Sequence, residues 1–224
     1  MVSIIIPVLN EEKNIEKILI QLNNLEISKE IIVVDGGSTD NTVLIASKYA
    51  KVISSPKGRA KQMNNGALIS KGEILWFLHC DSKISEGSIE SIEKAISKGY
   101  DAGCFSLYFY DYSSPFLKYI SYTSNLRAKY LKLYFGDQGI FIKRSVFEDI
   151  GGYKDIPLME DFELSMRLKK RANTVVLKDK IGTSARRFIE GGPFKTFLLM
   201  QYIKLLYILN VPIEKIASIY KDIR

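Results

Sequence analysis

The stretch VSIIIPVLNEEKNIEKILIQLNNLEISKEIIVVD (residues 2–35) decides the fold of this chain. Its two ends, residues 2–6 and 30–34, are short apolar runs rich in β-branched residues, as is typical of buried strands. Between them, Asn10 and the two glutamates after it open a helix. The apolar side chains of this helix have the spacing of one buried face: Ile15, Ile18, Leu19 and Leu22. A strand, a helix and a second strand in this order predict a parallel βαβ unit.

The same alternation continues after residue 35. Apolar runs at residues 51–54 and 73–79 supply two more expected strands. The Ser-Thr-Asp sequence at residues 38–40 is a suitable cap for a helix that continues to Tyr49. We therefore expect a parallel sheet whose faces are covered by helices.

The pattern changes after residue 100. Residues 104–110 (CFSLYFY) alternate as a strand does, and residues 140–143 (IFIK) predict another short strand. An aromatic-rich helical stretch lies between them at residues 115–134. The sequence indicates an α/β fold with a mostly parallel sheet, a mixed second half and a helical C-terminus. We expect one domain over residues 1–224, made of a first half (1–100), a second half (101–190) and a helical extension (191–224).

Composition narrows the class of protein. The chain has 224 residues, of which 46% are hydrophobic and 25% charged, so it can bury a full core and is not disordered. Its two cysteines, Cys80 and Cys104, form no disulfide framework. The N-terminus lacks the features of a signal peptide, and no uncharged apolar run is long enough to span a membrane. These features predict a cytoplasmic protein.

Positive charge is concentrated at the C-terminal end. Residues 1–163 hold 19 Lys or Arg and 21 Asp or Glu, whereas residues 164–224 hold 13 and 4, so the formal charge of +7 is −2 plus +9. Such an end fits phosphate groups of a ligand, an anionic membrane surface, or a solvated basic face without a partner. No nucleic-acid recognition motif accompanies it, so we expect no nucleic-acid partner.

The segment PFKTFLLMQYIKLLYIL (residues 193–209) is the most apolar part of this basic end. Its large side chains have near-helical spacing: Phe194, Phe197, Leu198, Leu205, Leu206 and Leu209. Core packing explains them, as does contact with a membrane or a second subunit. We expect at most peripheral contact with the inner face of a membrane.

Polar residues follow each early strand, in PVLNEE (7–12), DGGSTDNT (35–42) and HCDS (79–82). Because ligands of open α/β sheets bind beyond the carboxyl ends of parallel strands, these loops predict one shared cleft. Each loop also has a structural explanation as a turn, a helix cap or a first helical turn. The segment KGRAKQMNNGA (57–67) would suit phosphates at a helix N-terminus, or a solvated helix start.

Taken together and in order, six segments resemble the family 2 glycosyltransferases, and a small bacterial subgroup most closely: SIIIPVLNEE, IIVVDGGSTDNT, GRAKQMNNGA, ILWFLHCDS, FGDQGIFIKR and MEDFELSMRL. The resemblance covers roughly residues 2–190. It implies a GT-A fold with a Rossmann-like central sheet, a nucleoside-diphosphate sugar donor with a UDP-sugar preferred, Mn²⁺ or Mg²⁺, and inversion at the anomeric carbon. The acceptor, a glycan, a lipid or a small molecule, stays open.

The resemblance also implies roles for residues on the donor side. Pro7 and Glu11 match the first nucleotide-binding loop, and Asp35 matches the acid that contacts the base. Asp40 belongs to the same motif, and Arg59 matches a basic position near the donor phosphates.

Metal binding and catalysis fall on later segments. Asp81 matches the last acid of the family's D-x-D metal motif, and Asp161 matches the catalytic base. A carboxylate suits both tasks, since it is a hard ligand and can take a proton from a hydroxyl. Where many relatives carry the first acid of that motif, this chain has His79, its only histidine. His79 is either a metal ligand better suited to Mn²⁺ or a hydrogen-bonded structural residue.

Four more residues are candidates for contact with the acceptor or the donor: Gln138, Glu160, Arg186 and Arg187. The arginines could pair with diphosphate oxygens or be solvated surface residues. Two other functions fit less well. A nucleotidyltransferase that makes nucleotide sugars would need a glycine-rich phosphate loop, which is absent after the first strand. The basic C-terminus would also suit a non-catalytic nucleotide-sugar-binding or membrane-associated protein.

Overall fold

The structure, a computed structural model, describes residues 1–222, so residues 223 and 224 of the expected C-terminal extension lie outside it. Its centre is one seven-stranded sheet with the order β3-β2-β1-β4-β6-β5-β7. The strands are β1 (Val2–Val8), β2 (Lys29–Asp35), β3 (Lys51–Ser54), β4 (Ile74–Phe77), β5 (Ala102–Phe109), β6 (Phe141–Lys143) and β7 (Thr174–Thr183). Only β6 runs antiparallel to its neighbours within this sheet, so the predicted mostly parallel sheet with a mixed second half is confirmed.

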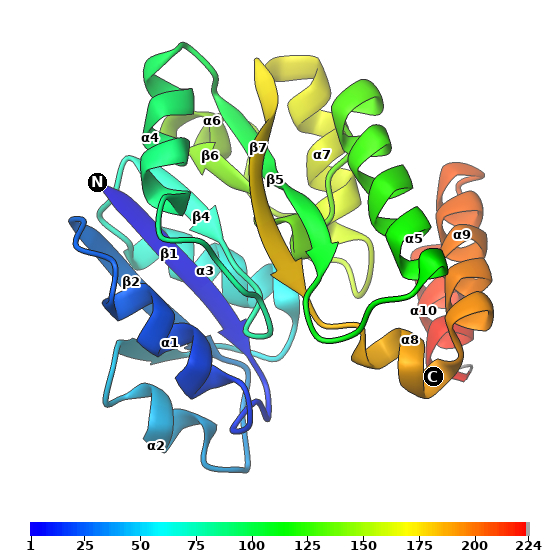
Figure 1. The fold of residues 1–224 in the computed structure, drawn as a ribbon, viewed down its shortest axis with the longest axis horizontal. Coiled ribbons are helices and arrows are strands. Elements are labelled where there is room, and N and C mark those ends of the chain that lie inside the picture. The colour runs from blue at the N-terminus through cyan, green and yellow to red at the C-terminus, as the bar shows by residue number, and fades with distance from the viewer. Residues whose placement is uncertain (223–224) are drawn as a thin grey trace.

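Helices cover both faces of the sheet (Figure 1). They are α1 (Ile15–Asn23), α2 (Thr42–Ala46), α3 (Arg59–Ile69), α4 (Ser88–Ser97), α5 (Pro115–Leu126), α6 (Arg144–Asp149), α7 (Glu160–Arg171), α8 (Arg186–Gly191), α9 (Pro193–Ile208) and α10 (Ile213–Asp222). Helices α1 and α4 pack on one face, and α3, α6 and α7 pack on the other. Helices α5, α8, α9 and α10 gather at the end of the molecule away from α2 (Figure 1).

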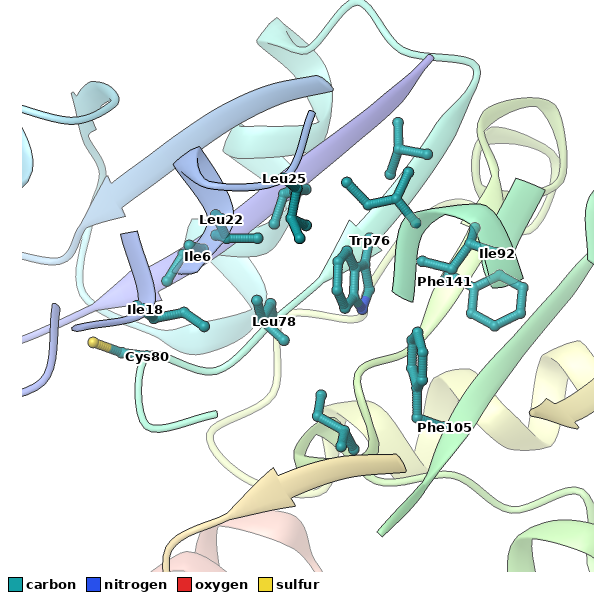
Figure 2. Close-up of a cluster of buried hydrophobic side chains, with 14 of the residues drawn as sticks. Ile6, Ile18, Leu22, Leu25, Trp76, Leu78, Cys80, Ile92, Phe105 and Phe141 are labelled. Carbon is teal, nitrogen blue, oxygen red and sulfur yellow. The ribbon is translucent and has the colours of Figure 1, made fainter. Parts of the chain in front are cut away.

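Alternation along the strands divides the core between these two faces. On β1, Ile4 and Ile6 face α1, whereas Ile5 faces α3, and all three are fully buried. The four apolar positions predicted for α1 are likewise fully buried. Figure 2 shows Trp76 of β4 in the cluster on the α1 side of the sheet. Its ring centroid lies 5.4 Å from that of Phe105. Burial of apolar area on both faces stabilises a sheet of this kind.

Three expected helix boundaries need correction. The helix expected to continue to Tyr49 is α2, which ends at Ala46 and is followed by a turn. The first helix begins at Ile15 rather than after Asn10, because Asn10 has a left-handed backbone (φ 56°) and the carbonyl of Glu11 accepts N–H bonds from Asn14 and Ile15 in a turn. The helix expected over residues 115–134 is shorter: α5 ends at Leu126, and one π-helical turn, Arg127–Leu131, follows it.

Strand β7 was not predicted at all. It lies at the edge of the sheet, where β5 is its one neighbouring strand in the described part of the chain and Gly182 forms an isolated bridge to Lys83. It carries Lys178, Asp179 and Lys180 in its middle. Charged side chains are common on edge strands, where they discourage pairing with another chain, and they hide the apolar pattern. Pairing of β7 with β5 nevertheless completes the second half of the sheet.

The C-terminal helix α9 is only partly a core helix. Phe197 and Leu206 pack against neighbouring clusters, but Phe194, Leu198 and Leu205 are 64%, 50% and 53% exposed. Core packing therefore explains the apolar residues on one side of α9 but not the exposed apolar residues on the other side. Within residues 1–222, no helix has the length and apolar character needed to cross a membrane.

Candidate active site

The carboxyl ends of the parallel strands bring the predicted loops to one edge of the sheet. Val8 of β1 lies opposite Asp35 of β2, and Asp35 lies opposite Ser54 of β3. Since β6 runs antiparallel beside β4, the turn before β6 comes back to the same edge, where Phe77 N–H donates to the carbonyl of Ile140 at 2.9 Å. Segments far apart in sequence thus meet there, as the spacing of the strand-end acids predicted.

The first two loops are held together by side chains from both. The backbone N–H of Glu11 donates to the hydroxyl of Thr42 at 2.7 Å, and that of Glu12 donates to Asp40 at 3.2 Å. Asp40 also accepts the N–H of Thr42 at 3.0 Å, which places it at the start of α2. Asp40 therefore caps this junction, and its predicted contact with the donor stays a prediction, as does that of Glu11.

Asp35 is buried beneath the second loop. Its carboxylate accepts the N–H groups of Gly37 and Ser38, at 2.9 Å and 3.1 Å, so it fixes the turn that follows β2. Below it, the Gln62 amide donates to the carbonyls of Val8 and Val34, at 2.8 Å each, and fastens α3 to the ends of β1 and β2. Asp35 therefore stabilises a turn, which is the structural explanation given for this loop from the sequence. Its contact with a nucleotide base remains a prediction.

Arg59 at the first position of α3 reaches across the edge to α7. Its Nη1 lies 3.3 Å from Oε1 of Glu160, whose side chain is 4% exposed, while that of Arg59 is 47% exposed. Burial opposes the charge of Arg59, but the carboxylates of Glu160 and Asp161 outweigh burial and raise its pKa. About half of the Arg59 side chain remains open to solvent at a helix N-terminus, where a phosphate could bind it.

Asp161 lies in the first turn of α7 and is 9% exposed. Its Oδ2 accepts the N–H of Gly136 and its Oδ1 accepts that of Phe162, both at 2.7 Å. Burial and then the charge of Glu160 raise the pKa of Asp161 to about 7, although the two N–H donors and Arg59 act in the opposite direction. A carboxylate with a pKa near neutrality has the basicity that a general base needs.

His79 lies next to this carboxylate. A Cβ atom added at Gly136 would be 2.5 Å from Nε2 of His79 and 3.4 Å from Oδ2 of Asp161, so only glycine fits between the two. Nε2 is buried and, among the described residues, has no hydrogen-bond partner. Burial, together with the charges of Arg59 and Arg187, lowers the pKa of His79 to about 3. The imidazole is therefore neutral and has an unused nitrogen, as a metal ligand requires.

Asp81 follows two residues later at the mouth of β4 and is half-buried. No hydrogen bond or ion pair to another side chain engages its carboxylate in the part of the chain that the structure describes. No group of three or more metal-ligating side chains occurs among residues 1–222. Mg²⁺ and Mn²⁺ sites at diphosphates commonly use one or two protein carboxylates, substrate oxygens and water. An unengaged Asp81 fits such a site, provided that a substrate supplies the other ligands.

The turn before β6 carries Gln138, a predicted contact of the donor or the acceptor. Gln138 is fully buried, its Oε1 accepts a bond from Arg127 at 2.9 Å, and its Nε2 faces the carbonyl of Phe105 at 3.4 Å. Its amide is thus occupied inside the protein, which argues against the predicted contact with donor or acceptor. The neighbouring Asp137, which sequence reasoning passed over, has a buried Oδ1 without a partner among the described residues.

The charges of other candidate site residues act on Asp137. Burial raises its pKa, as does the charge of Asp81, and the charges of Arg127, Arg187 and Arg59 lower it. Because these groups come from four separate segments, Asp137 lies amid the predicted site residues. This second acid was visible in the sequence GDQG, but there the glycines favoured a turn and drew attention to Gln138.

The two predicted arginines follow β7. Asp111 accepts bonds from the hydroxyl of Ser184 and the N–H of Ala185, the latter at 2.7 Å, and so fixes the chain just before α8. Arg186 lines a cavity of about 420 Å³ together with Asp81, whereas the charge of Arg187 acts on His79 and Asp137. Both arginines are exposed, so both remain available to a ligand.

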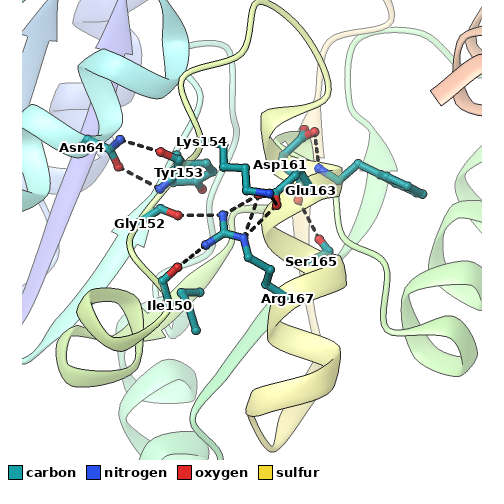
Figure 3. A network of polar contacts seen from close by, with 10 residues as sticks. Asn64, Ile150, Gly152, Tyr153, Lys154, Asp161, Glu163, Ser165 and Arg167 are labelled. Carbon is teal, nitrogen blue, oxygen red and sulfur yellow. Dashed lines mark hydrogen bonds and ion pairs between the residues drawn. The ribbon is translucent and has the colours of Figure 1, made fainter. Parts of the chain in front are cut away.

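A polar network behind α7 holds the first turn in place (Figure 3). Arg167 bonds the carboxylate of Glu163 through two nitrogens and also donates to the carbonyls of Ile150 and Gly152. Lys154 adds an ion pair to Glu163 at 2.8 Å. On the other side of the loop, Asn64 exchanges two hydrogen bonds with the backbone of Tyr153. These contacts fix the segment that leads into Glu160 and Asp161.

Comparison with known proteins identifies the family. The family model described as Glycosyl transferase family 2 matches residues 3–151, which is most of the chain. The chain belongs to glycosyl transferase family 2. The resemblance inferred from the six motifs is therefore confirmed, and so is the GT-A type of fold, since solved structures of that type superpose on it.

Curated relatives are similar over part of their length. The chain is 26% identical over 193 residues to the probable glycosyltransferase YdaM of Bacillus subtilis, covering 75% of this chain and 46% of YdaM. It is 30% identical over 114 residues to the dolichyl-phosphate beta-glucosyltransferase of Mus musculus, covering 42% of this chain and 35% of the mouse protein. The chain thus spans about a third to a half of the first curated relatives.

Solved structures match more of the chain at lower identity. Glucosyl-3-phosphoglycerate synthase from Mycobacterium tuberculosis superposes with a TM-score of 0.67 at 16% identity, covering 95% of this chain and 80% of that one. Residues 1–349 of S. aureus TarS superpose with a TM-score of 0.68 at 21% identity, covering 82% and 60%. At these identities the likeness concerns the fold alone.

Proposed function

We propose that this family 2 chain is a metal-dependent, inverting glycosyltransferase that moves a sugar from a nucleoside-diphosphate sugar to an acceptor hydroxyl. The observation that carries the proposal is the relation between Asp161 and the loops around it. A buried carboxylate with a pKa near neutrality lies next to His79, two residues before a strand-end acid, Asp81, whose carboxylate has no hydrogen bond or ion pair among the described residues. A base and a diphosphate site are the two parts that sugar transfer to a hydroxyl needs.

In the proposed reaction, Asp161 accepts the proton of the acceptor hydroxyl as that oxygen attacks the anomeric carbon of the sugar. The new bond joins the acceptor oxygen to this carbon, and the bond from the carbon to the diphosphate oxygen breaks. The nucleoside diphosphate leaves with the electron pair. Attack in line with the leaving group inverts the configuration of the anomeric carbon. The N–H groups of Gly136 and Phe162 hold the Asp161 carboxylate in one orientation while it accepts the proton.

The donor would lie over the carboxyl ends of β1 to β4. Pro7, Glu11, Asp35 and Asp40 line the first two loops and are proposed to hold the nucleoside, while Arg59 would pair with the diphosphate. Asp81, with His79 as a second candidate, would hold Mn²⁺ or Mg²⁺, which when bound neutralises the charge that develops on the leaving diphosphate.

Residues outside the first two loops complete the proposal. Asp137 would add a carboxylate for a hydroxyl of the donor sugar, since its Oδ1 lacks a partner among residues 1–222. Glu160 acts through Arg59, with which it pairs. Arg186 would face the acceptor in the cavity beside Asp81, and Arg187 would approach the diphosphate.

The names of the structural neighbours support a UDP-sugar donor and a divalent metal. TarS of S. aureus has been solved with UDP-GlcNAc and with UDP. Glucosyl-3-phosphoglycerate synthase has been solved with UDP and Mg²⁺, and the mannosyltransferase PcManGT of Pyrobaculum calidifontis with GDP-Man and Mn²⁺. The acceptor class stays open among glycans, lipids and small molecules. A single domain over residues 1–224 and peripheral contact of the C-terminus with a membrane are further parts of the proposal.

Two rival functions predict different products. A nucleotidyltransferase would release pyrophosphate from a nucleoside triphosphate and a sugar phosphate. A non-catalytic binding protein would bind a nucleotide sugar and convert none of it. Neither rival requires a buried carboxylate of neutral pKa next to the donor edge, which is the reason to prefer sugar transfer.

The test is a thermal-shift screen of UDP-, GDP- and dTDP-sugars with and without Mn²⁺, followed by an assay of nucleoside diphosphate release with the stabilising donor. Because a ligand that binds only the native state raises the melting temperature, the correct donor should shift it, and more so with Mn²⁺. Donor turnover that depends on an added acceptor supports the proposal. Pyrophosphate release, or binding without turnover across a broad acceptor panel, would establish one of the rivals instead.

A further inference from the structure

Helix α9 presents a continuous apolar stripe to solvent. Its members recur at intervals of three and four residues, which places them on one helix face: Phe194, Leu198, Tyr202, Leu205 and Leu209. They are between 48% and 64% exposed. The opposite side of α9 is the one that packs, through Thr196 and Ile203, which are at most 7% exposed. A helix that is apolar all round usually has a second apolar surface against it.

Helix α5 extends this surface. The ring of Phe116 lies 6.0 Å from that of Phe194 and 6.4 Å from that of Tyr119, so aromatic contacts run from α9 to α5. Beyond them, Tyr119 and Tyr122 are 53% and 63% exposed. The two helices lie side by side at the end of the molecule (Figure 1). We call the five side chains of the α9 stripe, with Tyr119 and Tyr122, the α5–α9 face.

The two helices that form this face carry charged side chains of one sign only. Residues 112–136 and 191–213, which contain α5 and α9, hold six Lys or Arg and no Asp or Glu. Lys118 and Lys195 stand next to Tyr119 and Phe194 in the chain, are exposed, and form no ion pair in the described part of the chain. The face therefore combines exposed leucines, exposed tyrosines and unpaired positive charges.

We propose that the α5–α9 face binds the surface of an anionic lipid bilayer. Leucine and phenylalanine side chains enter the boundary between headgroups and acyl chains, tyrosine rings lie at the level of the headgroups, and flanking lysines pair with anionic lipid. Each part of the face matches one of these roles. The helices lie on the bilayer and do not cross it, because no helix in residues 1–222 is suited to span one.

A second copy of the chain suits the face less well. In a two-fold dimer this face of one copy would pack against the same face of the other copy. Lys118 and Lys195 of the two copies would then lie close together. Like charges at an interface oppose association, and neither helix carries an acid to offset them. The positive charge is instead complementary to an anionic surface.

Bilayer binding would also affect the proposed transfer. Arg186, which lines the cavity beside Asp81, is the first residue of the short helix α8, and α9 begins two residues after α8 ends. A bilayer on the α5–α9 face would therefore lie near the edge of the sheet that carries the site. If the proposed function holds, acceptors displayed at the membrane surface would be concentrated there.

The test is flotation of the full chain with vesicles, in the absence of donor, so that it is independent of transferase activity. Vesicles of phosphatidylcholine alone are compared with vesicles that contain about 30% phosphatidylglycerol, at low and at high salt. Three double variants are compared with the wild type: Leu198→Gln with Leu205→Gln, Lys118→Glu with Lys195→Glu, and, as a matched control, Leu44→Gln with Leu68→Gln. The control leucines are exposed on α2 and α3, outside the α5–α9 face. Circular dichroism melts confirm that each variant folds.

The wild type and the control should float with anionic vesicles at low salt, and less at high salt. Each of the other two variants should bind about tenfold more weakly. Failure of the wild type to bind anionic vesicles would overturn the proposal, as would an equal loss in the control. A wild-type dimer that becomes monomeric in Leu198→Gln with Leu205→Gln, without lipid binding, would show that a second copy covers the face.

Discussion

The carboxylate of Asp161 accepts the backbone N–H of Gly136 at 2.7 Å, and this bond joins the first turn of α7 to the turn before β6. The two residues come from segments that are separated in sequence but meet at the carboxyl edge of the sheet. The bond fixes the orientation of a carboxylate whose pKa is raised to about 7, mainly by burial. Glycine suits position 136, because a Cβ there would lie 2.5 Å from Nε2 of His79 and would force the imidazole to move.

The first prediction concerns pH. Because the pKa of Asp161 is raised to about 7, the carboxyl is protonated below that pH and cannot accept a proton. Activity, measured as kcat/KM for the donor, should therefore rise with pH and level off above about pH 7. Initial rates between about pH 5 and about pH 8, with circular dichroism to verify folding, test this. A flat profile, or a rate that falls over this range, would contradict the role of Asp161.

The second prediction concerns Asp81. Asp81→Ala removes the carboxylate proposed to hold the metal, so Mn²⁺ should no longer strengthen donor binding, which we expect to fall at least about tenfold. Isothermal titration of the donor with and without Mn²⁺ measures the effect. Asp149→Ala, which removes an exposed acid of α6, is the matched control and should behave as wild type. An unchanged Mn²⁺ effect in Asp81→Ala would exclude a metal role for this residue.

The third prediction separates Asp137 from Gln138. Asp137→Asn should lower kcat/KM about tenfold or more and leave the melting temperature unchanged or raised, since a buried carboxylate oxygen without a partner among the described residues is costly. Gln138→Ala should instead destabilise the protein, because it removes the oxygen to which Nη2 of Arg127 donates and leaves that N–H group unpaired. Comparison of kinetics and thermal melts for both variants decides the point. Wild-type kinetics in Asp137→Asn would remove this residue from the site.

The fourth prediction concerns the network behind α7. Arg167→Met deletes a partner of the buried Glu163 carboxylate and two bonds to loop carbonyls, which should lower the free energy of unfolding by about 2–4 kcal/mol. Lys154 keeps part of the compensation. Urea unfolding measures the change, with Arg171→Met as a control at an exposed position of the same helix. Equal stability of the two variants would show that the network contributes little.

Much of the fold was predictable because the first half follows simple rules. Apolar runs on β1 to β4 and the helical spacing on α1 identify a parallel sheet without further information. The second half obeys them less well. Strand β7 carries charges as an edge strand, and β6 is only three residues long, so neither has an unambiguous pattern. Their positions depend on pairing with distant strands, which local sequence does not reveal.

The part of the site that lies at the ends of the strands was predictable, because the strands themselves were. The acids after β2 and β4 were expected to share an edge, and they do. The choice between Asp137 and Gln138 was not, because it depends on how a 3₁₀ turn orients two adjacent side chains. The exposed stripe of α9 was also ambiguous, since a helix that is apolar all round does not show from sequence which side packs.

The assignment of Asp161 as the base is tested most directly by transfer kinetics and donor binding in Asp161→Asn. This change keeps the size of the side chain and removes its ability to accept a proton. We expect kcat to fall about 100-fold to 10,000-fold while the donor dissociation constant with Mn²⁺ stays within about threefold of wild type. Asp149→Asn serves as the control. Wild-type turnover by Asp161→Asn in the folded protein would contradict the account.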